Sequence, residues 1–149
     1  MKPLRMTVTM LLGGLAACLL LLTLTAERAA GPVKEMAPIV KAAPADAEWI
    51  SYGVYRQGIA WYTGRRSVVL DGTGELAYGR EHLDAVDQER WLPEDRDGLL
   101  ALASRLKLET GRPVVVVASP RDWEGVPAAT RAAFTVIAQN GGNVLAEFR

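Results

Sequence analysis

Apolar residues in this chain form one long run near the N-terminus and then several short runs separated by polar turns. The long run, MTVTMLLGGLAACLLLLTLT, covers residues 6–25 and contains no charge. At about 1.5 Å per helical residue it would be roughly 30 Å long, which matches the hydrocarbon core of a bilayer. Its leucines favour insertion, so the pattern predicts a transmembrane helix over residues 6–25.

The charges beside this run predict its orientation. Lys2 and Arg5 lie in a short tail of residues 1–5, and the positive-inside rule keeps such a tail in the cytoplasm. The chain after Glu27 would then be extracytoplasmic. We therefore expect a single-pass membrane protein that contacts membrane lipid through this helix.

Two other interpretations of the N-terminal run fit less well. A cleaved signal peptide has a shorter apolar core and small residues before the cleavage site, whereas Leu24 stands two positions before Ala26. Residues 15–18, LAAC, resemble a lipoprotein signal, but the uncharged stretch LLLLTLT follows the cysteine. We interpret Cys18 as a small apolar residue of the helix.

Residues 26–46 form an alanine- and proline-rich connector. Val33, Met36 and Val40 have helical spacing, but Pro38 lacks the backbone N–H that a helix interior uses. We expect a broken or kinked helix here, followed by a domain that covers residues 47–149.

Short apolar runs in residues 47–149 predict an α/β domain, because strand-like and helix-like patterns alternate. The expected strands are residues 48–53, 66–70, 113–119 and the two halves of 134–148, with a short extended piece over 74–79. Helices are expected over residues 55–62, ending at Gly64, and over residues 99–106. The run PVVVVAS is typical of a strand covered on both faces. Ser119 and Pro120 would then start a short helix.

The fold class that follows is a small layered α/β domain with a mixed sheet. Gly141 and Gly142 separate the last two strand-like runs, which is typical of an antiparallel hairpin at the C-terminus. The sequence DGTGEL, residues 71–76, lacks the lysine and the serine or threonine of a phosphate-binding loop, so its glycines are expected to form a turn.

Composition narrows the classes of function. The 149 residues suit one modest domain plus a short extra segment. Seventeen basic and seventeen acidic side chains balance, so we expect no nucleic-acid partner. Cys18 is the one cysteine and His82 the one histidine, which makes a zinc site of the usual Cys/His type implausible. We expect no metal and no other cofactor.

Candidate catalytic groups are scarce in the sequence. A serine hydrolase needs a base, and His82 lies in REHLDAVDQER, whose many charges are typical of a solvated helix face. The four tryptophans, Trp49, Trp61, Trp91 and Trp123, are interpreted as core or membrane-interface residues. The sequence therefore indicates no active site.

One segment resembles a known family. The stretch SYGVYRQGIAWYTGRRSVVLDGTGELAYG, residues 51–79, is similar to the segment after the last membrane helix of polyprenyl-phosphate-dependent glycosyltransferases. These include aminoarabinose (lipid A) transferases and protein mannosyltransferase-like enzymes. The residues that match the family pattern here are Ser51, Tyr52, Trp61, Tyr62, Gly64, Arg65 or Arg66, Glu75, Leu76, Tyr78 and Gly79. The C-terminal NGGNVLAEF also resembles the closing hairpin of these domains.

The resemblance implies a role in the cell envelope. The family's catalytic acidic residues lie in loops of a many-helix membrane body, and this chain has one predicted span, so no catalytic residue is carried over. We expect an accessory or C-terminal extracytoplasmic domain of a membrane glycosyltransferase that uses a polyprenyl-phosphate-linked sugar donor. It would work with a separately encoded multi-span body, or be the remnant of a truncated gene, and would not transfer sugar alone. The alternative is a single-span envelope protein that binds or scaffolds partners; a stand-alone enzyme comes third.

Arg65 and Arg66 have two interpretations. In the first, an arginine stem packs on Tyr62 with its charge in water, or pairs with Glu75 or with an acidic surface of the membrane body. In the second, one of them contacts a lipid-linked phosphate, because a guanidinium suits phosphate geometry.

Overall fold

The computed structural model of the chain describes residues 18–25, 31, 33–72, 74–140 and 142–149, with the side chain of Glu75 excepted. It divides into two compact units, Met1–Lys34 and Glu35–Arg149. In the first unit, residues 18–25 are helical. Among the described residues we find no helix with the length and apolar character to cross a bilayer. Most of the predicted span over residues 6–25 falls on residues 6–17, outside the described residues, so the span stays a prediction.

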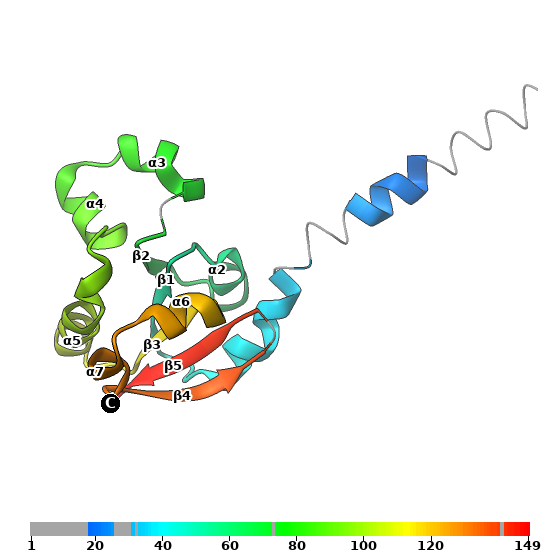
Figure 1. The fold of residues 1–149 in the computed structure, drawn as a ribbon. Helices are drawn as coiled ribbons and strands as arrows, with labels where there is room; N and C mark the ends of the chain where they lie inside the picture. Colours follow the sequence, from blue (N-terminus) through cyan, green and yellow to red (C-terminus); the bar gives the residue numbers. More distant parts are fainter. Residues whose placement is uncertain (1–17, 26–30, 32, 73, 141) are drawn as a thin grey trace, which may run out of the picture. The chain divides into compact units, whose positions relative to one another are not determined.

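A five-stranded mixed sheet forms the centre of the second unit (Figure 1). Its strands are β1 (Glu48–Tyr52), β2 (Ser67–Leu70), β3 (Val114–Ala118), β4 (Phe134–Gln139) and β5 (Val144–Phe148). They lie in the order β2-β1-β3-β5-β4. β1 is parallel to β2 and β3, whereas β5 is antiparallel to β3 and β4. The expected mixed α/β fold and its C-terminal hairpin are confirmed.

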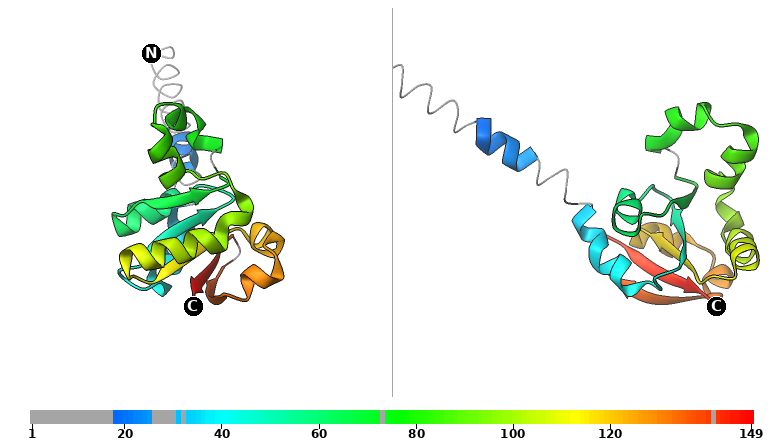
Figure 2. Two further views of the ribbon diagram at one scale, coloured as in Figure 1. Left: turned by 90° about the vertical axis from the view of Figure 1, so that its left-hand side faces the viewer. Right: turned by 180° about the vertical axis from the view of Figure 1, so that it is seen from behind.

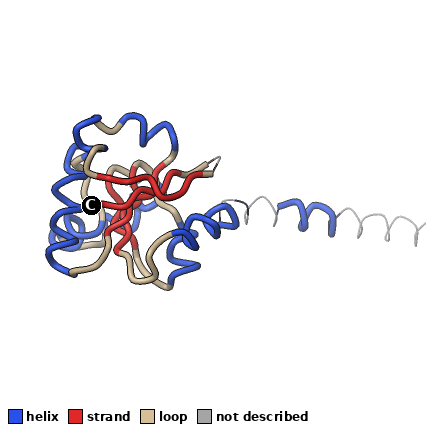
Figure 3. The backbone as a smooth tube through the Cα atoms, turned by 90° about the horizontal axis from the view of Figure 1, so that it is seen from below, coloured by secondary structure: helices blue, strands red, loops and turns tan. Residues whose placement is uncertain are grey.

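Short helices connect the strands and lie on both sides of the sheet (Figure 3). They are α2 (Gln57–Thr63), η1 (Gly74–Leu76), α3 (Ala77–Glu81), α4 (Ala85–Trp91), η2 (Arg96–Gly98), α5 (Leu99–Thr110), α6 (Pro120–Gly125) and α7 (Ala128–Arg131). Figure 2 shows α5 running along one face of the sheet. Two expected helix ends are confirmed: Gly64 closes α2 with a φ of 66°, and Ser119 caps α6 by accepting a hydrogen bond from the backbone N–H of Asp122.

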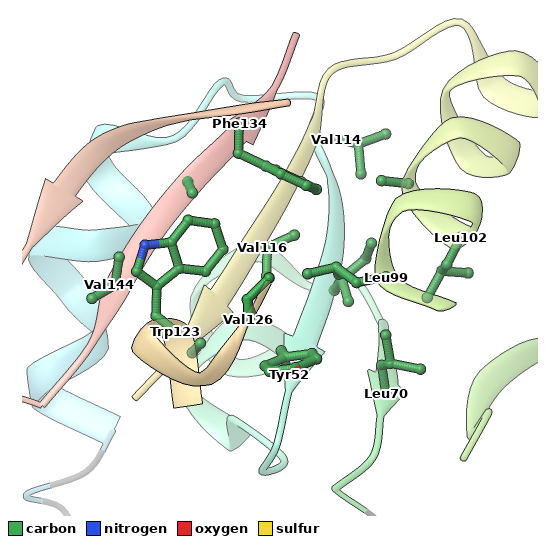
Figure 4. Close-up of a cluster of buried hydrophobic side chains, with 14 of the residues drawn as sticks. Tyr52, Leu70, Leu99, Leu102, Val114, Val116, Trp123, Val126, Phe134 and Val144 are labelled. Carbon is green, nitrogen blue, oxygen red and sulfur yellow. The ribbon is translucent and has the colours of Figure 1, made fainter. Parts of the chain in front are cut away.

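The sheet separates two apolar cores because successive side chains of a strand point to opposite faces. On one face, Ile50 and Val116 belong to a cluster that includes Leu99 of α5 and Trp123 of α6 (Figure 4). On the other face, Trp49, Val115 and Leu145 pack with Ile59 of α2 and with Met36 and Ile39. All five residues of β3 are buried, which confirms that this strand is covered on both faces.

The helix before β1 differs from the expectation. Of the expected broken or kinked helix, the break is wrong, because residues 33–42 are helical through Pro38. Met36 and Ile39 are each 1 % exposed, and their burial against the sheet offsets the hydrogen bond that proline cannot make. The second compact unit begins at Glu35 and so includes residues 35–46, which the sequence pattern assigns to the connector.

The segment after β2 also differs from the expectation. Residues 74–81 form η1 and α3, so the extended piece predicted over residues 74–79 is wrong. Leucine and alanine are good helix formers, and this segment pairs with neither edge strand, β2 or β4, of the described sheet. The neighbour of β2 on its outer side is α4 with the loop after it, where the backbone N–H of Asp71 donates to the carbonyl of Pro93 at 3.1 Å.

Candidate functional site

The carboxyl ends of three parallel strands, β1, β2 and β3, meet at one edge of the sheet. After β1 the chain enters α2, whose Ile59 packs on one face, whereas after β3 it enters α6, whose Trp123 packs on the opposite face. Loops that leave neighbouring parallel strands toward opposite faces open a crevice between them, and open α/β sheets bind ligands there. A ligand-binding site is therefore expected at this edge of the sheet.

Arg96 of η2 joins the ends of all three strands. Its Nε donates to the hydroxyl of Tyr52 at 3.2 Å. Its Nη1 lies 3.3 Å from Oδ2 of Asp71, which follows β2, and its Nη2 lies 3.4 Å from Oδ1 of Asp122 in α6. The guanidinium carbon also lies 5.7 Å from the centre of the Tyr52 ring. We call Tyr52, Asp71, Arg96 and Asp122 the strand-end cluster.

The charges of the strand-end cluster largely satisfy one another. The hydrogen bond to Tyr52 is the main cause of a raised pKa for Arg96, and the charge of Asp71 contributes. Asp122 has a second partner in Ser119, whose Oγ donates to Oδ2 of Asp122 at 2.6 Å. The cluster is thus a set of mutual ion pairs and hydrogen bonds that fixes three loops.

A second arginine lies at the same edge and is less well satisfied. Burial lowers the pKa of Arg56, and the charges of Asp122 and Glu35 oppose that shift. The Nε of Arg56 is buried and has no hydrogen-bond partner among the described residues. The Nε of Arg56 is thus a buried donor whose hydrogen-bonding capacity is unused within the described residues.

Two glycines allow the loops at this edge to approach closely. A Cβ on Gly72 would lie 2.6 Å from the backbone nitrogen of Val54, and a Cβ on Gly53 would lie 2.7 Å from the carboxyl carbon of Asp122. Gly53 also has a φ of 78°, which favours glycine. An open hollow of about 570 Å³ lies beside them, between the loops that follow β1 and β2, with Glu94 on its rim. That carboxylate pairs with Arg80 of α3.

The side chains at this edge offer charged and hydrogen-bonding groups to a polar ligand. Among the described residues, no group of three or more His, Cys, Asp or Glu side chains could hold a metal ion. His82 lies at the end of α3 with its ring 4.7 Å from that of Tyr78, and it has no hydrogen-bond contact with the strand-end cluster. The hydroxyl of Ser119 lies beside the carboxylate of Asp122, and this pair caps the start of α6.

The structure places the family-motif residues at separate positions. Tyr52 is buried and belongs to the strand-end cluster. Trp61 and Tyr62 lie on α2 with 78 % and 42 % of their surfaces exposed, and Tyr78 of α3 is 76 % exposed. Gly79 lies in α3, where an added Cβ would meet nothing within 4 Å. The side chain of Glu75 lies outside the described residues. The motif thus marks fold positions and does not form one site within the described part of the chain.

Arg65 and Arg66 make different contacts. Nη1 of Arg65 donates to the carbonyl of Asp46 at 2.7 Å and to that of Ala47 at 3.3 Å, which ties the start of β2 to the loop before β1. The guanidinium of Arg66 lies 5.7 Å from the centre of the Trp91 ring. The aromatic ring beside Arg66 is therefore that of Trp91. The predicted pairing with Glu75 concerns a side chain outside the described residues.

These contacts predict different effects for the two arginines. Arg65→Gln is expected to lower the free energy of unfolding by about 1 kcal/mol, because two carbonyls lose a charged donor. Arg66→Gln should change it by less than about 0.5 kcal/mol, since its head is exposed. Urea unfolding of both variants followed by circular dichroism checks this. A larger loss for Arg66→Gln than for Arg65→Gln would contradict the assignment.

Sequence reasoning missed most of the strand-end cluster. Asp71 lies in the segment over residues 71–76 for which the sequence predicts a turn. Arg96 and Asp122 are far in the sequence from each other and from Tyr52. One signal was available: a polar residue follows each of the expected strands 48–53, 66–70 and 113–119 within a few positions, and such residues converge at the carboxyl edge when the strands are parallel.

Comparison with known proteins supports the fold. Two crystal structures of ArnT from Cupriavidus metallidurans match 78 % of this chain, one in the apo state and one bound to undecaprenyl phosphate. The apo structure has a TM-score of 0.54 and 18 % sequence identity, and the bound structure 0.55 and 17 %. The matched part of this chain and the matched part of ArnT share a fold. The match covers 20 % of the ArnT chain. No protein-family model matches the chain, and no curated protein matches it in sequence.

Proposed function

We propose that residues 35–149 act as an extracytoplasmic domain of a membrane glycosyltransferase system that uses a polyprenyl-phosphate-linked sugar. The observation that carries this proposal is the fold shared with ArnT over 78 % of the chain. Residues 51–79 also resemble this class of enzyme in sequence, which supports the proposal. One of the two ArnT structures was solved with undecaprenyl phosphate, a lipid of the proposed donor type.

The proposed domain is accessory rather than catalytic. The match covers 20 % of ArnT, and among the described residues no group of three or more His, Cys, Asp or Glu side chains could hold a metal ion. Sugar transfer would therefore need a separately encoded multi-span body, to which this chain would be held by the predicted span over residues 6–25. In this arrangement the N-terminus is cytoplasmic, residues 35–149 lie outside the membrane, and membrane lipid is a partner.

The proposal predicts a loss of sugar transfer when the chain is removed. Membranes from cells that lack the chain should transfer sugar from polyprenyl-phosphate donors to endogenous lipid acceptors more slowly than membranes that contain it. The measurement is incorporation of radiolabelled sugar into extracted lipid, with the full chain supplied again as the rescue control. Equal incorporation with and without the chain would contradict the proposal.

A second candidate function is that of a single-span envelope protein that binds or scaffolds partners without sugar transfer. The observation in its favour is the mutual pairing of charges in the strand-end cluster, which leaves no reactive group there. This candidate predicts unchanged sugar incorporation in the same assay and a partner that is not a glycosyltransferase.

A further inference from the structure

Two exposed aromatic side chains lie on α2, on the side of the helix away from the sheet. Ile59 packs into the core beneath α2, and Trp61, two positions later, lies on the opposite side because each residue turns a helix by about 100°. Trp61 is 78 % exposed and its neighbour Tyr62 is 42 % exposed. Within the described part of the chain, no ring and no cation stacks on Trp61.

Trp61 differs in this respect from the other three tryptophans. Trp49 and Trp123 are buried, and Trp91 is half-buried against the core beneath α5. Tryptophan is on average a highly buried residue, so an indole that keeps most of its surface in water is unusual. Covering that surface would stabilise a complex in proportion to the area removed from water.

The outer side of α2 is also uncharged. The sequence of the helix, QGIAWYT, contains neither an acidic nor a basic residue. A helix face in contact with water is normally charged or strongly polar. Tryptophan and tyrosine combine an apolar body with one polar group and are enriched where the headgroups of a bilayer meet its acyl chains. This surface therefore suits the interface of a neutral phospholipid.

α2 runs beside the helix that precedes β1, and in the same direction. At the start of α2, Arg56 lies within range of the charge of Glu35, the first residue of the second unit. After the end of α2, Arg65 donates to the carbonyl of Asp46, which follows the neighbouring helix. Both helices contribute side chains to the same core, and Figure 1 shows α2 beside residues 35–42. The surface that carries Trp61 is thus next to the segment through which the chain enters this unit.

The length of chain before this unit limits how far Trp61 can lie from a bilayer. Nine residues, 26–34, separate the span predicted over residues 6–25 from Glu35. A fully extended chain of that length reaches about 35 Å. Trp61 is five residues after Arg56, and so about 8 Å further along α2. With the predicted span in a bilayer, the membrane is therefore the partner that the chain itself keeps within reach of Trp61.

We propose that Trp61 and Tyr62 insert into the headgroup region of the bilayer that holds the chain, and that this contact orients residues 35–149 on the membrane surface. The inference rests on the membrane location given under the proposed function and adds the surface that meets the lipid. It requires no contact with the strand-end cluster, which lies at the carboxyl edge of the sheet.

The test uses the full chain reconstituted in phosphatidylcholine vesicles in which part of the lipid carries bromine on the acyl chain close to the headgroup. Bromine quenches the fluorescence of a tryptophan that it contacts. All four tryptophans lie within residues 49–123, so the predicted span contributes no emission. The parent chain should be quenched, and Trp61→Phe should remove most of the quenched emission. The matched control, Trp91→Phe, removes a tryptophan that packs on the opposite face of the sheet and should leave the quenched emission unchanged.

Cross-linking in native membranes identifies the molecule that Trp61 meets. A photoreactive residue in place of Trp61 should attach to lipid, whereas one in place of Leu108, which is 86 % exposed on α5, should not. The inference is overturned if the parent emission is not quenched, if Trp61→Phe keeps the quenched emission, or if the photoreactive residue at position 61 attaches to a polypeptide.

Failure of this inference is distinguishable from failure of the proposed function. Absence of quenching, together with sugar incorporation that depends on the chain, would overturn the lipid contact alone. Quenching through Trp61, together with sugar incorporation that does not depend on the chain, would overturn the proposed function alone.

Discussion

Trp123→Ala is expected to lower the free energy of unfolding by about 3–5 kcal/mol, which would leave the domain partly unfolded at ambient temperature. Trp123 is 8 % exposed, and its ring lies edge-on to that of Phe134 with 5.9 Å between the centres. Figure 4 shows it among Val126, Val144 and Phe134, where α6 meets the sheet. Removing the indole would leave a cavity that these side chains cannot fill. Urea unfolding followed by circular dichroism measures the loss.

The matched control for this change is Trp61→Ala. Trp61 has the same side chain but is 78 % exposed on α2, so the same truncation should change the free energy of unfolding by less than about 0.5 kcal/mol. A loss for Trp61→Ala as large as that for Trp123→Ala would show that Trp61 is buried in the protein as it exists, and would contradict the fold as described.

Gly72→Ala is expected to lower the free energy of unfolding by about 1–3 kcal/mol, because the new Cβ would overpack the loops at the carboxyl edge. That Cβ would lie 2.6 Å from the nitrogen and 2.8 Å from the Cα of Val54, both backbone atoms that cannot turn away as a side chain can. The loop after β1 would have to move, and with it the end of β1 that holds Tyr52. The measurement is the urea midpoint of the variant against that of the parent chain.

Gly79→Ala is the control for a glycine of the family motif. Its Cβ would meet nothing within 4 Å, and alanine is the better helix former in α3, so stability should stay equal or rise by up to about 1 kcal/mol. If Gly79→Ala were the more damaging of the two, the close contact at Gly72 would not be the cause of the predicted loss.

Patterns within a single element predicted much of the fold. The continuous apolar run of β3 indicated a strand covered on both faces, and the structure buries all five of its residues. Ser119 and Gly64 predicted helix ends from local chemistry, a hydroxyl that caps N–H groups and a residue that accepts a positive φ. The predictions of this strand and of these helix ends are confirmed because each depends on local residues and little on contacts with the rest of the chain.

The errors came where distant contacts decide the local structure. Pro38 predicted a broken helix, but Met36 and Ile39 are held against the sheet by residues of β1, β3 and β5. The segment over residues 74–79 can be helical or extended by propensity, and its conformation depends on whether it adds to the edge strand β2 or folds on itself. A single-sequence pattern carries no information on either contact.

The strand-end cluster was hard to predict for the same reason. Tyr52 and Arg96 are 44 positions apart, and only the sheet order brings the loops after β1, β2 and β3 together. The resemblance to glycosyltransferases pointed to residues 51–79, yet of its candidate residues Tyr52 alone is in this cluster among those the structure describes. The motif therefore identifies the type of domain more than the residues that act.

We propose that this chain works with a membrane glycosyltransferase body. The test is immunopurification from native membranes with an antibody against residues 49–149, followed by mass spectrometry of the intact chain and of the proteins recovered with it. We expect the chain to be recovered with a multi-span membrane protein that carries acidic residues in its extracytoplasmic loops. Recovery of the membrane-bound chain without any multi-span protein would contradict it.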